Sequence, residues 1–182
     1  MFKLWKRKEK NKVLVLLDFD NLYIGLSRGA IIESLDMVLK KITQEVGAIF
    51  KVFVFIPYQN AQLFGEKFYR AGFVPILCPE IKAKNKTNIN TTDQMMTDLG
   101  KDLIEGMPEI THLCLGSGDI DFSSGDIGFP SLLKKAEHYG LQIALIVSGI
   151  NSLSSELIKK ADRKPGKNEK MIYVLPEPEI ED

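Results

Sequence analysis

Runs of apolar residues recur along the chain and are separated by stretches in which apolar and polar positions alternate with helical spacing. The runs are continuous, which is typical of strands buried on both faces of a parallel sheet. They cover residues 13–21, 50–56, 73–78, 111–116, 141–147 and 171–175. Helical patterns cover residues 31–46, 59–71, 92–105, 130–139 and 151–161. This alternation predicts an α/β fold in which helices cover both faces of a mostly parallel sheet.

The size and composition of the chain fit one globular domain. It has 182 residues, 24 basic and 24 acidic side chains, and a hydrophobic fraction of 45%. These values exclude a disordered or disulfide-stapled chain. We expect a domain over residues 12–176, a flexible basic arm at 1–11 and an acidic tail at 177–182. Cys78 and Cys114 lie in apolar runs and are expected to be buried free thiols.

The chain shows no sign of a membrane-spanning or secreted protein. No apolar stretch approaches the ~18 residues that a membrane-spanning helix needs. The uninterrupted apolar part of the run behind the basic arm, Val13–Leu17, stops at Asp18 and Asp20, which makes it too short for the apolar core of a signal peptide. We therefore expect a cytoplasmic protein that makes no contact with a membrane.

A long, polar connection at residues 79–91 carries Lys82, Lys84 and Lys86. Connections of this length are uncommon unless they are mobile or functional. Two interpretations stay open, a disordered surface loop and a loop whose lysines contact a polyanion. Since the net charge of the chain is zero, any attraction for nucleic acid must be local.

Acidic side chains gather where the expected strands end and the expected helices begin. Asp18 and Asp20 close the first strand, Asp93 begins the third helix, and Asp119 and Asp121 follow the fourth strand. In open α/β sheets, ligands bind beyond the carboxyl ends of the strands, where the strand order reverses. If the first and fourth strands are neighbours, Asp18 and Asp119 meet in that crevice.

The helix that follows the basic connection can be oriented from its apolar positions. Met96, Leu99 and Leu103 recur with helical spacing and define its buried stripe. At about 100° per residue, Asp93 lies at the flank of this stripe, whereas Asp98 lies toward solvent on the other side. Asp93 is therefore the better candidate for a shared site. The alternative is an acid that stabilises the amino end of the helix.

A cluster of carboxylates needs compensation. Two unit charges ~4 Å apart repel by about 4 kcal/mol at an effective dielectric constant of ~20. Three or four carboxylates in one crevice therefore require raised pKa values or a bound cation. No pair of His or Cys lies nearby in the sequence to favour zinc, and an all-oxygen set suits Mg²⁺ or Mn²⁺. Such ions commonly serve phosphoryl chemistry.

Several of these segments together resemble the NYN domain, a group of PIN-like nucleases that includes the bacterial LabA-like proteins. The segments are LLDFDNLYIGL, TTDQMMTDL, HLCLGSGDIDF and FPSLLKKAEHYGLQIALIV, with a weaker echo in SSELIKKADR. The resemblance implies a Rossmann-like three-layer α/β/α sandwich with a mostly parallel central sheet. It also implies metal-dependent cleavage of RNA, with RNA as partner and Mg²⁺ or Mn²⁺ as cofactor. A homodimer is one assembly left open.

The resemblance also assigns roles to individual residues. It makes Asp18, Asp93 and Asp119 metal ligands, directly or through water. Asp121 completes the cluster, and Asn21 orients a water or a phosphate oxygen. Around this acidic crevice, the three lysines of the connection are expected to bind RNA phosphates.

Two acids depart from the family pattern. Asp20 replaces a residue that is usually small or variable and adds a charge beside Asp18. Asp98 falls one position short of the place expected for the family's second helix acid. Both are secondary candidates for the site.

The motif after the fourth strand is nearly duplicated, as SGDIDF at 117–122 and SGDIGF at 124–129. Because the first copy directly follows the strand, the site is assigned to Asp119. If the second copy were the functional one, Asp126 would take that place.

Two other functions stay open. A non-catalytic RNA-binding or regulatory module could keep the fold and the acids without turnover. A haloacid-dehalogenase-like phosphatase also begins with a strand that ends in Asp-x-Asp, which would make Asp18 a nucleophile and Asp20 a general acid. The first motif of such phosphatases normally continues with Gly-Thr, whereas Asn21 and Leu22 follow here.

Overall fold

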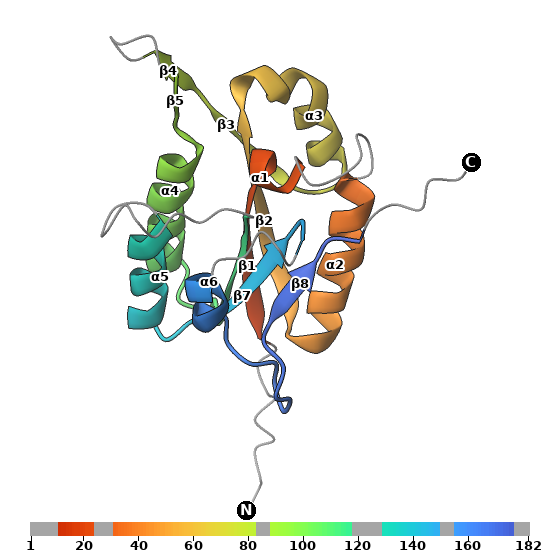
Figure 1. Ribbon diagram of the computed structural model, residues 1–182, viewed down its shortest axis with the longest axis vertical. Coiled ribbons are helices and arrows are strands. Elements are labelled where there is room, and N and C mark those ends of the chain that lie inside the picture. Colours follow the sequence, from red (N-terminus) through yellow and green to blue (C-terminus); the bar gives the residue numbers. More distant parts are fainter. Residues whose placement is uncertain (1–10, 24–30, 83–87, 118–128, 150–154, 177–182) are drawn as a thin grey trace, which may run out of the picture.

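The computed structural model describes residues 11–23, 31–82, 88–117, 129–149 and 155–176. Six parallel strands form the central sheet in the order β3-β2-β1-β6-β7-β8 (Figure 1). The strands are β1 (Lys12–Asp18), β2 (Ala48–Pro57), β3 (Val74–Cys78), β6 (His112–Gly116), β7 (Gln142–Val147) and β8 (Ile172–Val174). The helices are α1 (Phe19–Tyr23), α2 (Ile31–Glu45), α3 (Tyr58–Arg70), α4 (Thr92–Gly106), α5 (Phe129–His138) and α6 (Ser155–Lys160).

Helices cover both faces of this sheet, so the predicted three-layer α/β/α architecture is confirmed. On one face, α2 and α3 pack against the strands, and on the other face α4, α5 and α6 do so (Figure 1). Successive residues of β1 belong to the two cores in turn, and all of Val13–Leu17 are fully buried. A central strand covered on both faces needs apolar side chains at every position, which explains the continuous apolar run.

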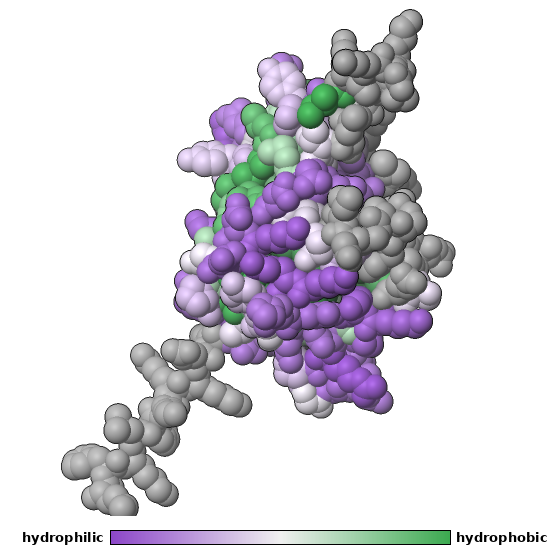
Figure 2. Space-filling view, turned by 90° about the vertical axis from the view of Figure 1, so that its left-hand side faces the viewer, coloured by the Kyte–Doolittle hydropathy of each residue, from purple (hydrophilic) through white to green (hydrophobic). Residues whose placement is uncertain are grey.

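The outer face of the molecule around α4 and α5 carries charge rather than apolar surface. Figure 2 shows this side, and long hydrophilic side chains cover much of it. The ion pair between Lys135 and Glu105 joins the two helices at 2.8 Å. No helix among the described residues is long and apolar enough to cross a bilayer. Cys78 and Cys114 are free and buried, as predicted.

The strand order reverses between β1 and β6. The chain proceeds from β1 to β2 and β3 on one side of the sheet, and from β6 to β7 and β8 on the other. Leu17 of β1 pairs with Gly116 of β6, so the two strands end side by side, and the condition for a shared crevice at their ends is met. A Cβ atom on Gly116 would lie 2.4 Å from Leu17 Cδ2 and 3.0 Å from Leu22 Cδ1. Glycine at this position therefore lets α1 pack closely over the ends of both strands.

The first apolar run ends earlier than expected. The sequence predicts one element through Asn21, but β1 ends at Asp18 and α1 begins at Phe19. The Asp18 carboxylate accepts a hydrogen bond from the backbone N–H of Asn21 at 3.3 Å, which is the arrangement of a helix N-cap. Phe19 then packs on Tyr23 and Phe64, with ring centroids 4.9 Å apart in both pairs. The same acid thus ends the strand and begins the helix.

The connection at 79–91 contains two strands that the sequence does not predict. β4 (Glu80–Lys82) and β5 (Asn88–Asn90) pair antiparallel, with Ile81 opposite Ile89. Each strand has a β-branched residue between two polar ones, but three residues are too few for a clear alternating pattern. The hairpin extends from the end of β3 and leads into α4 (Figure 1).

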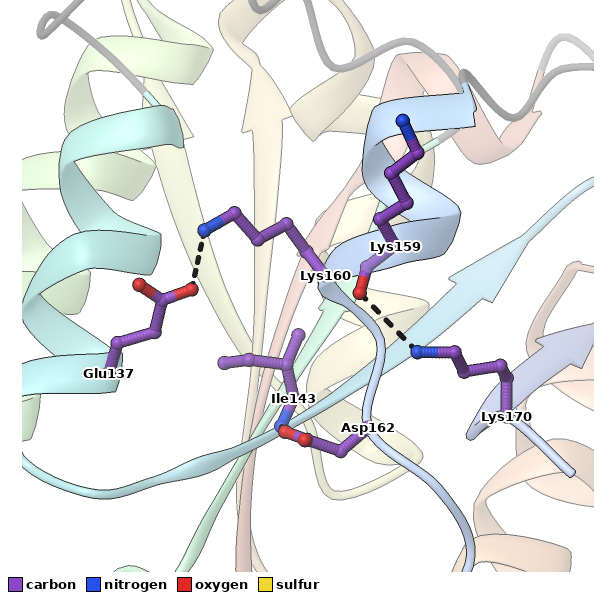
Figure 3. A network of polar contacts seen from close by, with 6 residues as sticks. All are labelled: Glu137, Ile143, Lys159, Lys160, Asp162 and Lys170. Carbon is purple, nitrogen blue, oxygen red and sulfur yellow. Dashed lines mark hydrogen bonds and ion pairs between the residues drawn. The ribbon is translucent and has the colours of Figure 1, made fainter. Parts of the chain in front are cut away.

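At the amino-terminal ends of the strands, opposite Asp18, polar contacts hold α6 and the segment that follows it. The backbone N–H of Ile143 in β7 donates to Asp162 Oδ2 at 2.7 Å, and Lys160 pairs with Glu137 of α5 at 2.6 Å (Figure 3). Lys170 Nζ donates to the Lys159 carbonyl at 3.3 Å. These contacts join α6 and the following segment to α5 and β7, at the edge opposite Asp18.

Candidate active site

Asp18 lies at the carboxyl end of β1, where the strand order reverses, and is only 2% exposed. The Nδ2 group of Asn21 donates to Asp18 Oδ2 at 2.9 Å and to Ser117 Oγ at 3.2 Å. Ser117 directly follows β6 and is itself buried. The Asn21 amide therefore connects the ends of β1 and β6 and fixes the orientation of the Asp18 carboxylate.

The charged form of Asp18 is disfavoured in this position. Burial is the main cause that raises the pKa of Asp18 to about 7, while the hydrogen bond from the Asn21 backbone lowers it. The charges of Asp93 and Asp20 also raise this pKa, as does a side-chain hydrogen bond with Asp93. The structure thus brings Asp93, the second residue of α4, against Asp18, two acids that are 75 positions apart in the sequence.

Asp20 has a different set of contacts. Its Oδ1 accepts a hydrogen bond from Asn60 Nδ2 of α3 at 3.0 Å. Burial raises the pKa of Asp20, the Asn60 hydrogen bond lowers it, and the charge of Glu80 raises it. Asp20 therefore links α1 to α3, and its charge is repelled by Glu80 of β4 and acts on Asp18.

The other predicted site residues are not brought into this group by the described structure. Asp98 is exposed on α4 and accepts a hydrogen bond from Gln94 at 2.7 Å. Lys82 ends β4. The remaining candidates, namely Asp119, Asp121, Asp126, Lys84 and Lys86, lie outside the described residues.

Two residues near Asp18, Ser117 and Cys78, and the Cys78 partner Thr92 are not assigned to the site by the sequence patterns. Ser117 is not among the candidate residues named from the sequence, yet it is the hydrogen-bond partner of Asn21. Cys78, at the end of β3, is buried. Burial raises the pKa of its thiol to about 11, a hydrogen bond with Thr92 lowers this pKa, and the charge of Asp18 raises it. The available signal is positional, because each of these residues lies where a parallel strand ends or a helix begins.

The donors present fit a divalent cation that prefers oxygen ligands. In the part of the chain that the structure describes, no group of three or more His, Cys, Asp or Glu is placed to hold a metal ion. Asp18 and Asp93 supply two carboxylates, and Mg²⁺ is commonly bound through one or two carboxylates with water and phosphate oxygens completing its shell. Burial and the nearby Asp93 both disfavour the charged form of Asp18, so a bound cation would stabilise that form strongly.

Comparisons with known proteins place the chain in a family. A crystal structure of a protein of unknown function from Vibrio parahaemolyticus has the same fold, with a TM-score of 0.61 and 21% sequence identity over 92% of this chain and 93% of that chain. Comparison with curated proteins found no match. The model of the NYN domain family matches residues 12–164, which is most of the chain. The chain therefore belongs to the NYN domain family, a branch of the PIN-like nuclease superfamily.

Proposed function

We propose that this NYN domain is a metal-dependent endoribonuclease that hydrolyses RNA phosphodiester bonds at the carboxyl ends of β1 and β6. The observation that carries the proposal is the buried Asp18 carboxylate held against Asp93 at the point where the strand order reverses. Ligand sites of open α/β sheets lie at this point. Membership of a nuclease superfamily supports the same reaction class.

In this proposal Asp18 and Asp93 hold Mg²⁺ or Mn²⁺, and Asp119 and Asp121 join them from the motif that follows β6. The bound ion supplies positive charge at the scissile phosphate and lowers the pKa of a water molecule. Asn21 holds Asp18 in one orientation, because its amide is also bonded to Ser117.

Metal binding is expected to stabilise the fold. Addition of Mg²⁺ or Mn²⁺ at ~100 times its dissociation constant should stabilise the protein by about 2.7 kcal/mol and raise its melting temperature. Asp93→Asn should remove this increment, since it deletes one of the two carboxylates. Asp98→Asn is the matched control on the same helix and should keep it, because Asp98 contacts Gln94. A wild-type melting curve that does not move in millimolar metal would contradict the metal site.

Cleavage of a closed circular RNA tests the reaction itself, since only an endonuclease can open the circle. We expect linear product with Mg²⁺ or Mn²⁺ and none with EDTA or with Asp93→Asn. Binding of the circle without cleavage would favour the non-catalytic RNA-binding module. Hydrolysis of a small phosphate ester with no action on RNA would favour the phosphatase, in which Asp18 is the nucleophile.

The lysines of the β4–β5 hairpin are proposed to hold RNA phosphates at the rim of the acidic site. Replacing Lys82, Lys84 and Lys86 with Ala should weaken binding of single-stranded RNA to Asp93→Asn protein, equally for all sequences. It should also reduce the slope of log affinity against log salt by roughly 0.7 for each phosphate that a lysine no longer neutralises.

A matched triple variant tests whether this effect is local. Replacement of Lys40, Lys41 and Lys51 removes the same charge from exposed positions toward the opposite edge of the sheet. This control should bind RNA with nearly the wild-type salt slope. Equal slopes for both triple variants would show that the hairpin lysines make no specific phosphate contact.

A further inference from the structure

A small pocket opens beside the proposed active site, at the same edge of the sheet. It has a volume of about 280 Å³ and is lined by Tyr58, Gln59, Pro79 and Glu80. The first two residues begin α3 directly after β2, and the other two directly follow β3. Because Pro57 at the end of β2 pairs with Cys78 at the end of β3, the two pairs of lining residues emerge side by side.

The pocket is close to the end of β1, and residues at or beside it act on Asp20. β2 lies between β1 and β3, so the pocket stands one to two strand spacings from the end of β1, about 5–10 Å. Asn60, next to the lining residue Gln59, donates to Asp20 at 3.0 Å. The charge of Glu80 acts on Asp20, and that of Asp20 acts on Asp18. A single-stranded polymer that is bound at Asp18 therefore passes the pocket within about one or two of its units.

The chemistry of the lining suits a nucleobase better than a phosphate. None of the four lining residues is cationic, and Glu80 would repel a phosphate group. Tyr58 is 62% exposed and offers an aromatic ring at the surface. Bases of single-stranded RNA are commonly stacked on such rings and read along their Watson–Crick edges. The volume is at the lower end of that of small-molecule sites, ~300 Å³ and above, and matches one base rather than a larger ligand.

Glu80 and Gln59 give this pocket a preference among the bases. A carboxylate has about four acceptor positions, so Glu80 can accept new hydrogen bonds while keeping its present partners. Guanine is the base that presents two adjacent N–H donors on its Watson–Crick edge, with a carbonyl acceptor beside them. The carboxylate of Glu80 matches the two donors, and the amide of Gln59 can donate to the carbonyl.

We infer that Tyr58, Gln59 and Glu80 form a base-recognition subsite that binds one RNA nucleotide next to the scissile phosphate and prefers guanine. The inference rests on the proposed ribonuclease function. With this subsite, the β4–β5 hairpin contacts RNA in two ways: its lysines hold phosphates, and Glu80, the first residue of β4, recognises a nucleobase.

Short RNAs that differ in one nucleotide test the subsite. Oligouridines with one central G, A, C or U are titrated into Asp93→Asn protein in EDTA, and binding is measured by fluorescence anisotropy. The same RNAs are digested by wild-type protein with Mn²⁺. We expect the G-containing RNA to bind about 10-fold more tightly than the others and to be cut at a fixed distance from the G. Each good pairing of a side chain with a base edge typically discriminates by this order.

Variants separate stacking from hydrogen bonding. Tyr58→Ala should weaken binding of all four RNAs by about 5- to 150-fold, the range found for loss of one stacked base, and Tyr58→Phe should restore most of it. Tyr69→Ala is the matched control, since Tyr69 is 73% exposed near the other end of α3. Glu80→Gln should abolish the preference for G, so that all four RNAs bind with similar affinity, and it should not weaken binding of the all-U RNA.

The outcomes distinguish the subsite from the ribonuclease function. Metal-dependent cleavage of all four RNAs at equal rates, with Tyr58→Ala equal to Tyr69→Ala, would overturn the subsite and leave the nuclease standing. A preference for G in binding that is abolished in Glu80→Gln, without any cleavage, would support the subsite and overturn the nuclease. A preference for another base that survives Glu80→Gln would overturn the assignment of guanine.

Discussion

Asp18→Asn is expected to reduce metal-dependent RNA cleavage at least about 100-fold and, at the same time, to stabilise the metal-free protein. The loss of activity follows from the proposed role of Asp18 as a metal ligand. Removal of residues that merely support a ligand commonly costs 10- to 100-fold in metal affinity or activity, and a ligand itself should cost more. Initial rates of RNA cleavage with saturating Mn²⁺ measure this effect.

The gain in stability follows from the burial of a charge. Burial raises the pKa of Asp18 to about 7 in the folded protein, against an ordinary value of 3.8. Below pH ~4 the carboxyl is protonated in both states and the shift has no effect on stability. As the pH rises toward 7, folding must retain a proton or bury a charge, so the metal-free wild type loses up to roughly 4 kcal/mol of stability. The neutral amide avoids this loss, and the advantage of the variant should grow from pH 4 to pH 8.

The local hydrogen bonds can accommodate the new amide. In the wild type, Asn21 Nδ2 donates to both Asp18 and Ser117. If the Asn21 amide turns over, its carbonyl can accept from the amide introduced at position 18 and from the Ser117 hydroxyl, which can donate or accept. Thermal unfolding in EDTA at several pH values tests the effect, with Asp36→Asn as a control at an exposed acid on α2. A lower melting temperature of Asp18→Asn at pH 8 would show that burial of this charge is already compensated in the metal-free protein.

The local contacts of Asp18 and Asp93 explain how much of the site could be predicted from the sequence. The spacing of Asp18 and Asn21 is local, and its physical basis is a helix N-cap, in which an acid accepts from a backbone N–H three positions later. The start of α4 near Asp93 could also be predicted, but its buried stripe could not. Met96 is buried as expected, whereas Leu99 and Leu103 are only partly buried. The other buried residues of α4 are Thr92, Thr97, Gly100 and Ile104. The place of both acids at one edge followed from the parallel order of strands, which continuous apolar runs indicate.

Other parts of the site depend on contacts between distant segments. Asp20 and Asn60 are 40 positions apart and meet only because α1 and α3 both begin at the carboxyl edge of the sheet. Ser117 resembles an ordinary turn residue until β6 is placed beside β1. The hairpin of β4 and β5 has three residues in each strand, which is too short for a periodic signal. Sequence patterns therefore predicted the framework well and the side-chain partners of its acids poorly.

Asp119→Ala is expected to abolish metal-dependent RNA cleavage, whereas Asp126→Ala should leave most of the activity. The two residues belong to the first and second copies of the near-duplicate motif after β6. Ser117 is described and is bonded to Asn21. Asp119 is only two positions after Ser117 in the sequence, which is why we propose that the first copy of the motif supplies the site.

Asp126 is seven positions further along the sequence than Asp119. It lies three residues before Phe129, which begins α5 and is buried in the core beneath that helix. An acid there suits the amino end of α5, where a negative charge is stabilised by the helix dipole. Asp126→Ala should therefore change stability by less than about 1 kcal/mol and keep both cleavage and the rise in melting temperature with Mn²⁺. Asp119→Ala should lose both, while its circular dichroism spectrum stays that of the folded protein. An inactive Asp126→Ala together with an active Asp119→Ala would assign the site to the second copy of the motif, and full activity of both would remove this segment from the nuclease proposal.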